Sequence, residues 1–338
     1  MALGDVRNNV QTGGARSGGN ASSQSRAVLA LGCCTNGTAN TLLQPGSQPA
    51  IASGLGLGML AEYAAKLLQH GAAAVYCVPV TPSIAGAVGS VTHVGTGSGT
   101  VSVSKAPHVA IITKCTNGGA LGTAKFRDSI DGGVTWLAEY TPSTSPDTHR
   151  VAGTYCNITL TDAVDPFVVD ETYAIGVNGS TTASAGWKGT VAFAASPLDN
   201  YNVKCTVNLG GALGTAQLSI SLDGGFNTLP PITIPAGGKI VIPNTGLVLT
   251  CANTFVATET YSFLAAPPSY STSDVQNALN AVMAMSTSPT VALVHSIGLP
   301  ASASSAISFA TALQTLRDTA AATYGKQWAC VTECPSSV

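Results

Sequence analysis

Leu55–Val80 reads LGLGMLAEYAAKLLQHGAAAVYCVPV, and this stretch decides the fold class. From Leu55 to Gln69 apolar residues recur at helical spacing, and His70-Gly71 provides a C-terminal stop. Ala74–Val80 is then a short, nearly unbroken apolar run, which is typical of a strand covered on both faces. A helix followed directly by such a strand indicates a β-α-β unit and hence a parallel sheet.

A second apolar run, Ala27–Cys34, lies upstream and reads as another buried strand, with a loop that contains Pro45 and Pro49 after it. The same pattern of helices and buried strands returns near the C-terminus, where Ser273 or Asp274 can cap a helix that stops near Pro289. Two further buried strands and a helix between them are expected at Val291–Val294, Trp328–Val331 and Ser302–Tyr324. The sequence therefore predicts an α/β core that is split between residues 26–85 and 268–338.

Between these halves the pattern changes to β-type alternation, after a Gly- and Ser-rich linker that ends at Ser104. Two motifs recur about 90 residues apart, a spacing that suits a β-sandwich module. Lys114–Ala124 recurs as Lys204–Ala216 with a two-residue insertion, and Glu-Thr-Tyr recurs at 171–173 and 259–261. We therefore expect two tandem all-β, sandwich-like domains inserted into the core, at residues 105–198 and 199–267.

Each copy contains a turn that resembles the Asp-box hairpin of sialidases and related propellers. The first copy fits the pattern S-x-D-x-G-x-T-W, whereas the second has decayed after its glycine. In such a turn the Asp accepts N–H groups, the Gly takes an unusual φ and the Trp packs beneath. The residues expected in this structural role are Ser129, Asp131, Gly133, Thr135, Trp136, Ser221, Asp223 and Gly225.

A sialidase-like enzyme is the weaker interpretation of these turns. Two modules cannot supply the four or more blades of a propeller. The arginine cluster that a carboxylate substrate needs is also missing, since Arg127 and Arg150 are the only arginines between residues 27 and 316.

The remaining motifs favour packing over catalysis. Gly54–Gly58 opens a helix, where glycines can cradle phosphate, but the ribose-binding acid and the tight strand-to-helix turn of a dinucleotide site are absent from the sequence. The five histidines show no metal-binding spacing, and His295 is more typical of a core or interface histidine. Neither Cys33-Cys34 nor Cys330–Cys334 completes a four-ligand set. We expect no enzyme activity, no cofactor and no metal.

Composition excludes other classes of protein. Of 338 residues only 9% are charged, where a soluble domain has about 25%. A net charge of −2 without a basic run argues against nucleic-acid binding, and 45% hydrophobic residues argue against disorder. The longest apolar runs are too short for a secretory signal or a membrane span, so a soluble chain is expected. Nine scattered cysteines favour a reducing, cytoplasmic place of synthesis.

Residues 1–25 are polar and rich in Gly, Ser and Asn, and they indicate an arm that becomes ordered only on a partner. Together with this arm and the split core, Leu55–Val80 resembles the helix, glycine turn and Val-Tyr-Val-Val strand of the contractile tail sheath proteins of bacteriophages and related injection machines. The resemblance covers roughly residues 1–85 and 268–338. Sheath proteins usually continue into a further C-terminal region, so this chain is either a short relative or ends early.

The resemblance implies a virion protein that is assembled in the host cytoplasm. Its subunits would form stacked six-fold rings around a tail tube, between baseplate and tail terminator, and would contract to drive the tube through the host envelope. Arms would add strands to neighbouring sheets, and the candidate contact residues are Leu3, Asp5, Val6, Arg7 and Val10. The alternative is a glycan- or surface-binding tail protein or adhesin that uses its repeated β modules.

Overall fold

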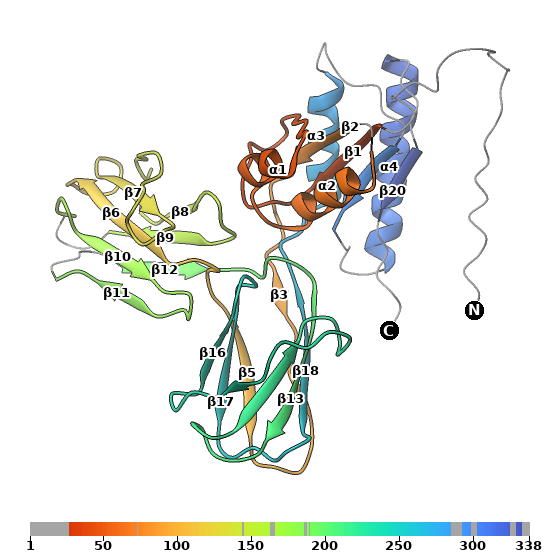
Figure 1. Ribbon diagram of the computed structural model, residues 1–338. Coiled ribbons are helices and arrows are strands. Elements are labelled where there is room, and N and C mark those ends of the chain that lie inside the picture. Colours follow the sequence, from red (N-terminus) through yellow and green to blue (C-terminus); the bar gives the residue numbers. More distant parts are fainter. Residues whose placement is uncertain are drawn as a thin grey trace, which may run out of the picture.

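The structure is a computed structural model that describes residues 27–72, 74–143, 145–162, 166–185, 188, 190–284, 293–298, 303–324 and 329–332. Their regular secondary structure is mostly β-strand, with twenty strands and four helices. They form three lobes, one α/β and two all-β (Figure 1). The proposed arm residues Leu3, Asp5, Val6, Arg7 and Val10 lie outside the described residues.

The α/β lobe is built on a four-stranded parallel sheet with the order β2-β1-β19-β20. Its strands come from both halves of the chain: β1 (Ala27–Gly32), β2 (Ala74–Pro79), β19 (Leu293–Ile297) and β20 (Ala329–Thr332). In the middle of the sheet, Ala30 pairs with Cys77 on one side and with His295 on the other. Segments more than 200 residues apart in sequence therefore lie side by side.

Helices cover both faces of this sheet, which explains why its strands are apolar without alternation. Alternate β1 side chains belong to two different cores: Leu29 and Leu31 pack with α3 (Thr272–Met283) and α4 (Ala303–Tyr324). Ala30 packs instead with α1 (Gln48–Leu55) and α2 (Met59–Gln69). The period of two along the strand thus divides the lobe into two apolar layers.

Two details of the helices differ from the sequence-based prediction. The region of Pro45 and Pro49 is not all loop, because Ser47 caps α1 by accepting a hydrogen bond from the Ala50 N–H at 3.3 Å, with Pro49 in the first turn. The single helix expected from Leu55 is broken at Gly56 and Gly58, which have φ of +70° and +107°.

The predicted N-cap of α3 also differs from the structure. Ser271, rather than Ser273 or Asp274, is the N-cap, and Asp274 closes a capping box by accepting the Ser271 N–H at 2.7 Å. The Asp274 carboxylate also accepts the hydroxyl of Ser83 at 2.5 Å, which ties the start of α3 to the segment after β2.

The first all-β lobe, here called the inner module (residues 107–195), packs two sheets over one core. Its sheets have the orders β11-β10-β6-β7 and β12-β9-β8. The strands are β6 (Ile111–Asn117), β7 (Lys125–Ser129), β8 (Asp147–Arg150), β9 (Asn157–Thr161), β10 (Thr172–Ile175), β11 (Thr181–Ala183) and β12 (Thr190–Ala194).

The second all-β lobe, the outer module, comprises residues 86–106 and 196–266. Its larger sheet has the order β15-β14-β13-β18-β3, with β4 also on β18, and its smaller sheet is β16-β17-β5. The strands are β3 (Ala87–Val88), β4 (Thr92–Val94), β5 (Thr100–Lys105), β13 (Tyr201–Leu209), β14 (Gln217–Ser221), β15 (Ile232–Thr233), β16 (Lys239–Ile242), β17 (Leu247–Ala252) and β18 (Thr260–Ala266).

The two β domains are therefore nested rather than tandem, and the predicted boundaries 105–198 and 199–267 are wrong. Residues 87–105 are not a linker, because β3 and β4 pair with β18 and β5 pairs with β17. Along β5 the side chain of Val101 is buried, whereas those of Ser102 and Ser104, on the other face of the strand, are exposed. A short amphipathic strand rich in Ser was mistaken for a flexible connection.

The internal repeat is confirmed as a structural repeat, but with a different alignment. Ser129 pairs with Ile112, and Ser221, 92 positions later, pairs with Lys204, which is also 92 positions after Ile112. Each copy has a β-bulge at the corresponding place, Cys115/Asn117 and Val207/Leu209. No insertion is needed, and the match between the two Lys-Cys-Thr triplets is out of register by two residues.

Candidate functional site

The candidate site is the junction where the inner module meets the α/β lobe. The turn between β8 and β9 is held by Thr154, whose hydroxyl donates to the Val151 carbonyl at 2.9 Å and accepts the Cys156 N–H at 3.0 Å. From this turn Tyr155, 5% exposed, enters the core below α3 and α4. The Gly153 N–H donates to the Thr35 carbonyl at 3.1 Å. The inner module thus inserts the Tyr155 side chain into the core of the α/β lobe and is held there by a backbone hydrogen bond.

The glycine run between α1 and α2 is shaped by this insertion. A Cβ at Gly58 would collide with the Tyr155 hydroxyl, and a Cβ at Gly56 would collide with the Thr35 hydroxyl. Thr35 Oγ1 also accepts the Leu57 N–H at 2.9 Å. Gly58 is the N-cap of α2, so Tyr155 occupies the position before the helix that a phosphate would need. The glycines serve close packing here.

The Tyr155 hydroxyl is buried and has no hydrogen-bond partner among the described residues. Burial, with Cys33 and Cys34 nearby, raises its pKa well above the usual value, so the phenol stays neutral. A buried hydroxyl without a partner is a cost that the packing of the ring must offset.

A carboxyl pair links α2 to the segment that enters the outer module. Glu62 and Asp199 share a side-chain hydrogen bond, which requires one proton between them. Burial raises the pKa of both carboxyls, and for Glu62 the Asp199 charge raises it further. Next to them the Asn200 amide donates to the sulfur of Met59 at 3.5 Å. The outer module therefore contacts the α/β lobe through groups that respond to pH.

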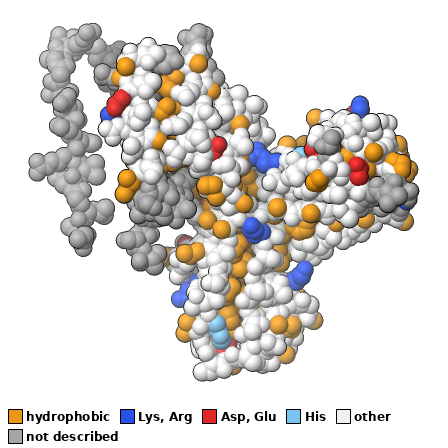
Figure 2. All heavy atoms as spheres, turned by 180° about the vertical axis from the view of Figure 1, so that it is seen from behind, with side chains coloured by type: hydrophobic (Ala, Val, Ile, Leu, Met, Phe, Trp, Pro, Cys, Tyr) orange, Lys and Arg blue, Asp and Glu red, His pale blue; other side chains and the backbone are white. Residues whose placement is uncertain are grey.

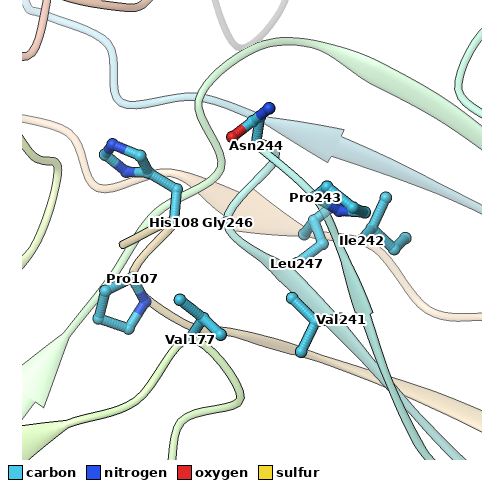
Figure 3. Close-up of a pocket in the computed structure, with 9 residues that line it drawn as sticks. All are labelled: Pro107, His108, Val177, Val241, Ile242, Pro243, Asn244, Gly246 and Leu247. Atoms are coloured by element: carbon cyan, nitrogen blue, oxygen red, sulfur yellow. The ribbon is translucent and has the colours of Figure 1, made fainter. Parts of the chain in front are cut away.

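The two modules meet each other over an apolar cavity of about 250 Å³ (Figure 3). Val177 of the inner module and Val241 of the outer module line it. Burial lowers the pKa of His108, which also lines it and stays neutral at pH 7. Close by, the Ala106 N–H donates to the Gly246 carbonyl at 3.0 Å.

The predicted Asp-box turns are built as expected in the first copy. Gly133 N–H donates to Ser129 Oγ at 2.8 Å, and Ser129 Oγ donates to Asp131 Oδ1, also at 2.8 Å. Asp131 accepts the Thr135 N–H at 2.9 Å and the Thr135 hydroxyl at 2.6 Å. Hydrogen bonds from Thr135 and Ser129 lower the pKa of Asp131 to about 2. Trp136 is 36% exposed, and its ring lies beside the turn, with Cζ2 3.7 Å from the Cβ position of Gly133.

The second turn has not decayed. Ser221, Asp223 and Gly225 repeat the bonds of the first copy at 2.7 and 2.8 Å. Asn227 replaces Thr135, since its N–H donates to Asp223 at 2.9 Å and its side-chain amide at 2.6 Å. The sequence pattern required Thr and missed that Asn offers an equivalent donor.

The repeated Glu-Thr-Tyr motif has a structural role that sequence reasoning did not assign. Glu171 accepts the Val168 N–H at 3.2 Å, and Glu259 accepts the Val256 N–H at 3.1 Å. Glu259 also accepts the N–H of Gly97, so within the outer module its buried carboxylate holds the β4–β5 connection against the start of β18. The recurrence of Glu three residues after an apolar position was the available signal.

His295 is a satisfied half-buried histidine, since its Nδ1 lies 2.6 Å from the Tyr63 hydroxyl and burial lowers its pKa. Within the described ranges no three His, Cys, Asp or Glu side chains are grouped as a metal site would need. In the same part of the chain, no helix combines the length and apolar character that crossing a membrane requires.

A family model described as DUF2586, N-terminal domain, matches residues 3–337. No curated protein matches the chain. A sheath tail protein from Listeria innocua is 11% identical with a TM-score of 0.32, and the match covers 94% of this chain and 49% of that one. A flagellar hook junction protein from Burkholderia pseudomallei is 14% identical with a TM-score of 0.12, and the match covers 73% and 53%. The chain spans about half the length of each.

Proposed function

The chain belongs to the DUF2586 family, and from that premise we propose that it is a tail sheath subunit of a contractile phage-type tail. In this proposal its copies form stacked hexameric rings around a tail tube in the virion, between baseplate and terminator. Contraction of the stack drives the tube through the host envelope. The role is mechanical and needs no catalysis, cofactor, nucleic acid or membrane insertion.

The observation that carries this proposal is the open edge of the parallel sheet. The opposite edge strand, β2, is partly covered, because Leu43 bridges to Cys77. Among the described strands β20 is the other edge of the sheet, and its one strand partner is β19. Figure 1 places β20 and α4 on the side of the lobe away from the inner module. A strand from a neighbouring copy can extend the sheet there.

The split core also supports a mechanical role. Because β1 and β19 are neighbours in one sheet, the two halves of the chain are locked together by main-chain hydrogen bonds. A pull on either half is therefore borne by the same sheet, and the lobe can move as a rigid body while its terminal segments act as hinges.

Electron microscopy of the purified full chain tests the proposal. We expect rings or tubes, and a chain that lacks residues 1–25 should keep its circular dichroism spectrum and thermal transition but remain a monomer. A monodisperse monomer of the full chain at high concentration would contradict the proposal. Assembly that is unchanged by the deletion would refute the arm mechanism alone.

A surface-binding function is the second candidate, and the tips of the Asp-box turns favour it. Val134 and Phe226 occupy corresponding positions in the two turns and are 81% and 90% exposed. Paired apolar tips on rigid hairpins are suited to contact with a glycan or a cell surface. A glycan array probed with the full chain tests this, and an array without hits removes the candidate.

A further inference from the structure

A cavity of about 320 Å³ lies where the inner module meets the carboxyl ends of β1 and β2. The α/β lobe contributes Cys34, Asn36 and Thr81 to its lining, and the inner module contributes Arg150 and Asn157. A second cavity of about 170 Å³ is also lined by Arg150 and Asn157, so the two adjoin. The carboxyl edge of a parallel sheet is where ligands bind most often in α/β folds.

The module side of the cavity is a flat row of side chains across three strands. Arg150 on β8 is the direct cross-strand partner of Asn157 on β9, which in turn pairs with Ala194 on β12. Direct partners in a ladder project from the same face of a sheet. Arg150 and Asn157 therefore present a guanidinium and an amide side by side toward the α/β lobe.

Arg150 lacks a counter-charge. It is half-buried, yet its guanidinium makes no hydrogen bond or ion pair with any residue that the structure describes. Neither cavity is lined by Asp or Glu. Asp274, which lies behind Ser83, is already committed to the Ser83 and Ser271 hydroxyls.

A second cation stands on the same side. Lys105 lines the smaller cavity, with its ammonium donating to the Gly86 carbonyl at 2.8 Å. Figure 2 shows basic side chains where the lobes meet. In a chain with 14 Lys and Arg among 338 residues, two at one cavity without an acid is a concentration of positive charge.

We propose that this junction cavity binds a small oxyanion, a carboxylate or a phosphate, between Arg150 and the α/β lobe. The planar guanidinium offers paired donors that match the two oxygens of either group. Asn157 and Thr81 supply further donors beside it. The larger cavity has room for several water molecules, so an anion with more than one oxyanion group fits better than a bare halide. A bound anion would join two lobes and so stabilise their junction.

Thermal unfolding of the full chain with and without inorganic phosphate or citrate, at ionic strength matched with sodium chloride, tests the site. We expect a saturable rise in melting temperature, because a ligand that binds the folded state alone stabilises it. Arg150→Gln should raise the apparent Kd at least tenfold. Arg127→Gln, which removes an exposed arginine of the same module, should leave it unchanged. The preference between the two probes identifies the anion class.

Arg150→Lys guards against a variant that does not fold, since it keeps the charge and the aliphatic stem but loses the paired donors. It should fold and bind several-fold more weakly than wild type. Equal stabilisation of all four proteins by the anions, or no stabilisation of the wild type, would overturn the proposal. The residues that line both cavities belong to a single subunit, so loss of anion binding and loss of ring assembly are separate outcomes.

Discussion

The hydroxyl of Tyr155 lies against Gly58, so close that the N-cap of α2 has no space for a Cβ. One residue belongs to the inner module and the other to the α/β lobe. This contact therefore limits how closely the inner module approaches the α/β lobe at this point.

Gly58→Ala should destabilise the protein for two separable reasons. The φ of +107° costs a non-glycine residue about 1–3 kcal/mol, and the collision with Tyr155 adds about 1–3 kcal/mol of overpacking. Gly71→Ala is the matched control, because Gly71 also has a positive φ but nothing lies within 4 Å of its Cβ position. Chemical denaturation of both variants measures the difference, and equal losses would show that the contact is unimportant.

Tyr155→Phe should be neutral or stabilising by up to about 1 kcal/mol, because it removes a buried hydroxyl without a partner. It should also reduce the cost of Gly58→Ala, since the clashing atom is the hydroxyl oxygen. A double-mutant cycle on unfolding free energies measures this coupling. Additive effects would mean that the two residues do not interact.

Asp131 should make the inner module sensitive to acid. Its folded pKa of about 2 lies below the ordinary value of 3.8, so its carboxylate stabilises the folded state above about pH 4. This contribution is lost as the pH falls through the folded value. The melting temperature of Asp131→Asn should therefore lie below that of wild type at pH 5, and the gap should close toward pH 2. A gap that stays constant with pH would refute the role of the charge.

The Glu62–Asp199 pair should have the opposite dependence. Because the folded pKa values are raised, the shared proton stabilises the junction at low pH and is lost as the pH rises through those values. Glu62→Gln supplies a hydrogen-bond donor, its amide, that does not titrate. It should therefore raise the melting temperature at about pH 8 and change it little at about pH 4.5. Lys66→Gln is the contrasting variant: it removes the 3.9 Å Lys66–Glu62 pair and a charge that lowers the pKa of both carboxyls, so the pH dependence should remain. A Glu62→Gln effect that is independent of pH would contradict the shared proton.

The buried cysteines should be unreactive in the folded protein. Burial raises the pKa of Cys34, Cys77, Cys156 and Cys205 to about 12, and that of Cys251 to about 11. Because the thiolate is the reactive form, alkylation at pH 7.5 followed by peptide mass spectrometry should leave these five unlabelled while half-buried Cys330 reacts. Rapid labelling of Cys205 or Cys251 would show that the outer module opens.

Periodicity was enough to place the four strands of the α/β lobe, because each is covered on both faces and reads as an apolar run, but it missed helix α1 in the region of Pro45 and Pro49. It failed at β4 and β5, where Gly95 and Gly97 are needed for close approach to the Glu259 side chain and made the region look like a linker. The contact that orders this segment spans more than 160 residues of sequence, which local pattern cannot show.

The candidate site was predictable only in part. The Asp-box bonds follow from residue type and spacing, so the first turn was found. Three features depend on which lobes meet: the insertion of Tyr155, the Glu62–Asp199 pair and the Arg150 cavity. Which lobes meet follows from the nesting of the modules. Lys114-Cys115 and Lys204-Cys205 looked equivalent, yet strand pairing sets them two residues out of register.

The nesting has a consequence for how such a chain can change over evolutionary time. Ala106 and Ser196, the last and first residues of the outer module on either side of the inner module, both contact Gly246. The chain thus enters and leaves the inner module at neighbouring points. An ancestor could have gained that module, and a descendant could exchange or delete it, by a single in-frame event that leaves every strand order outside it intact.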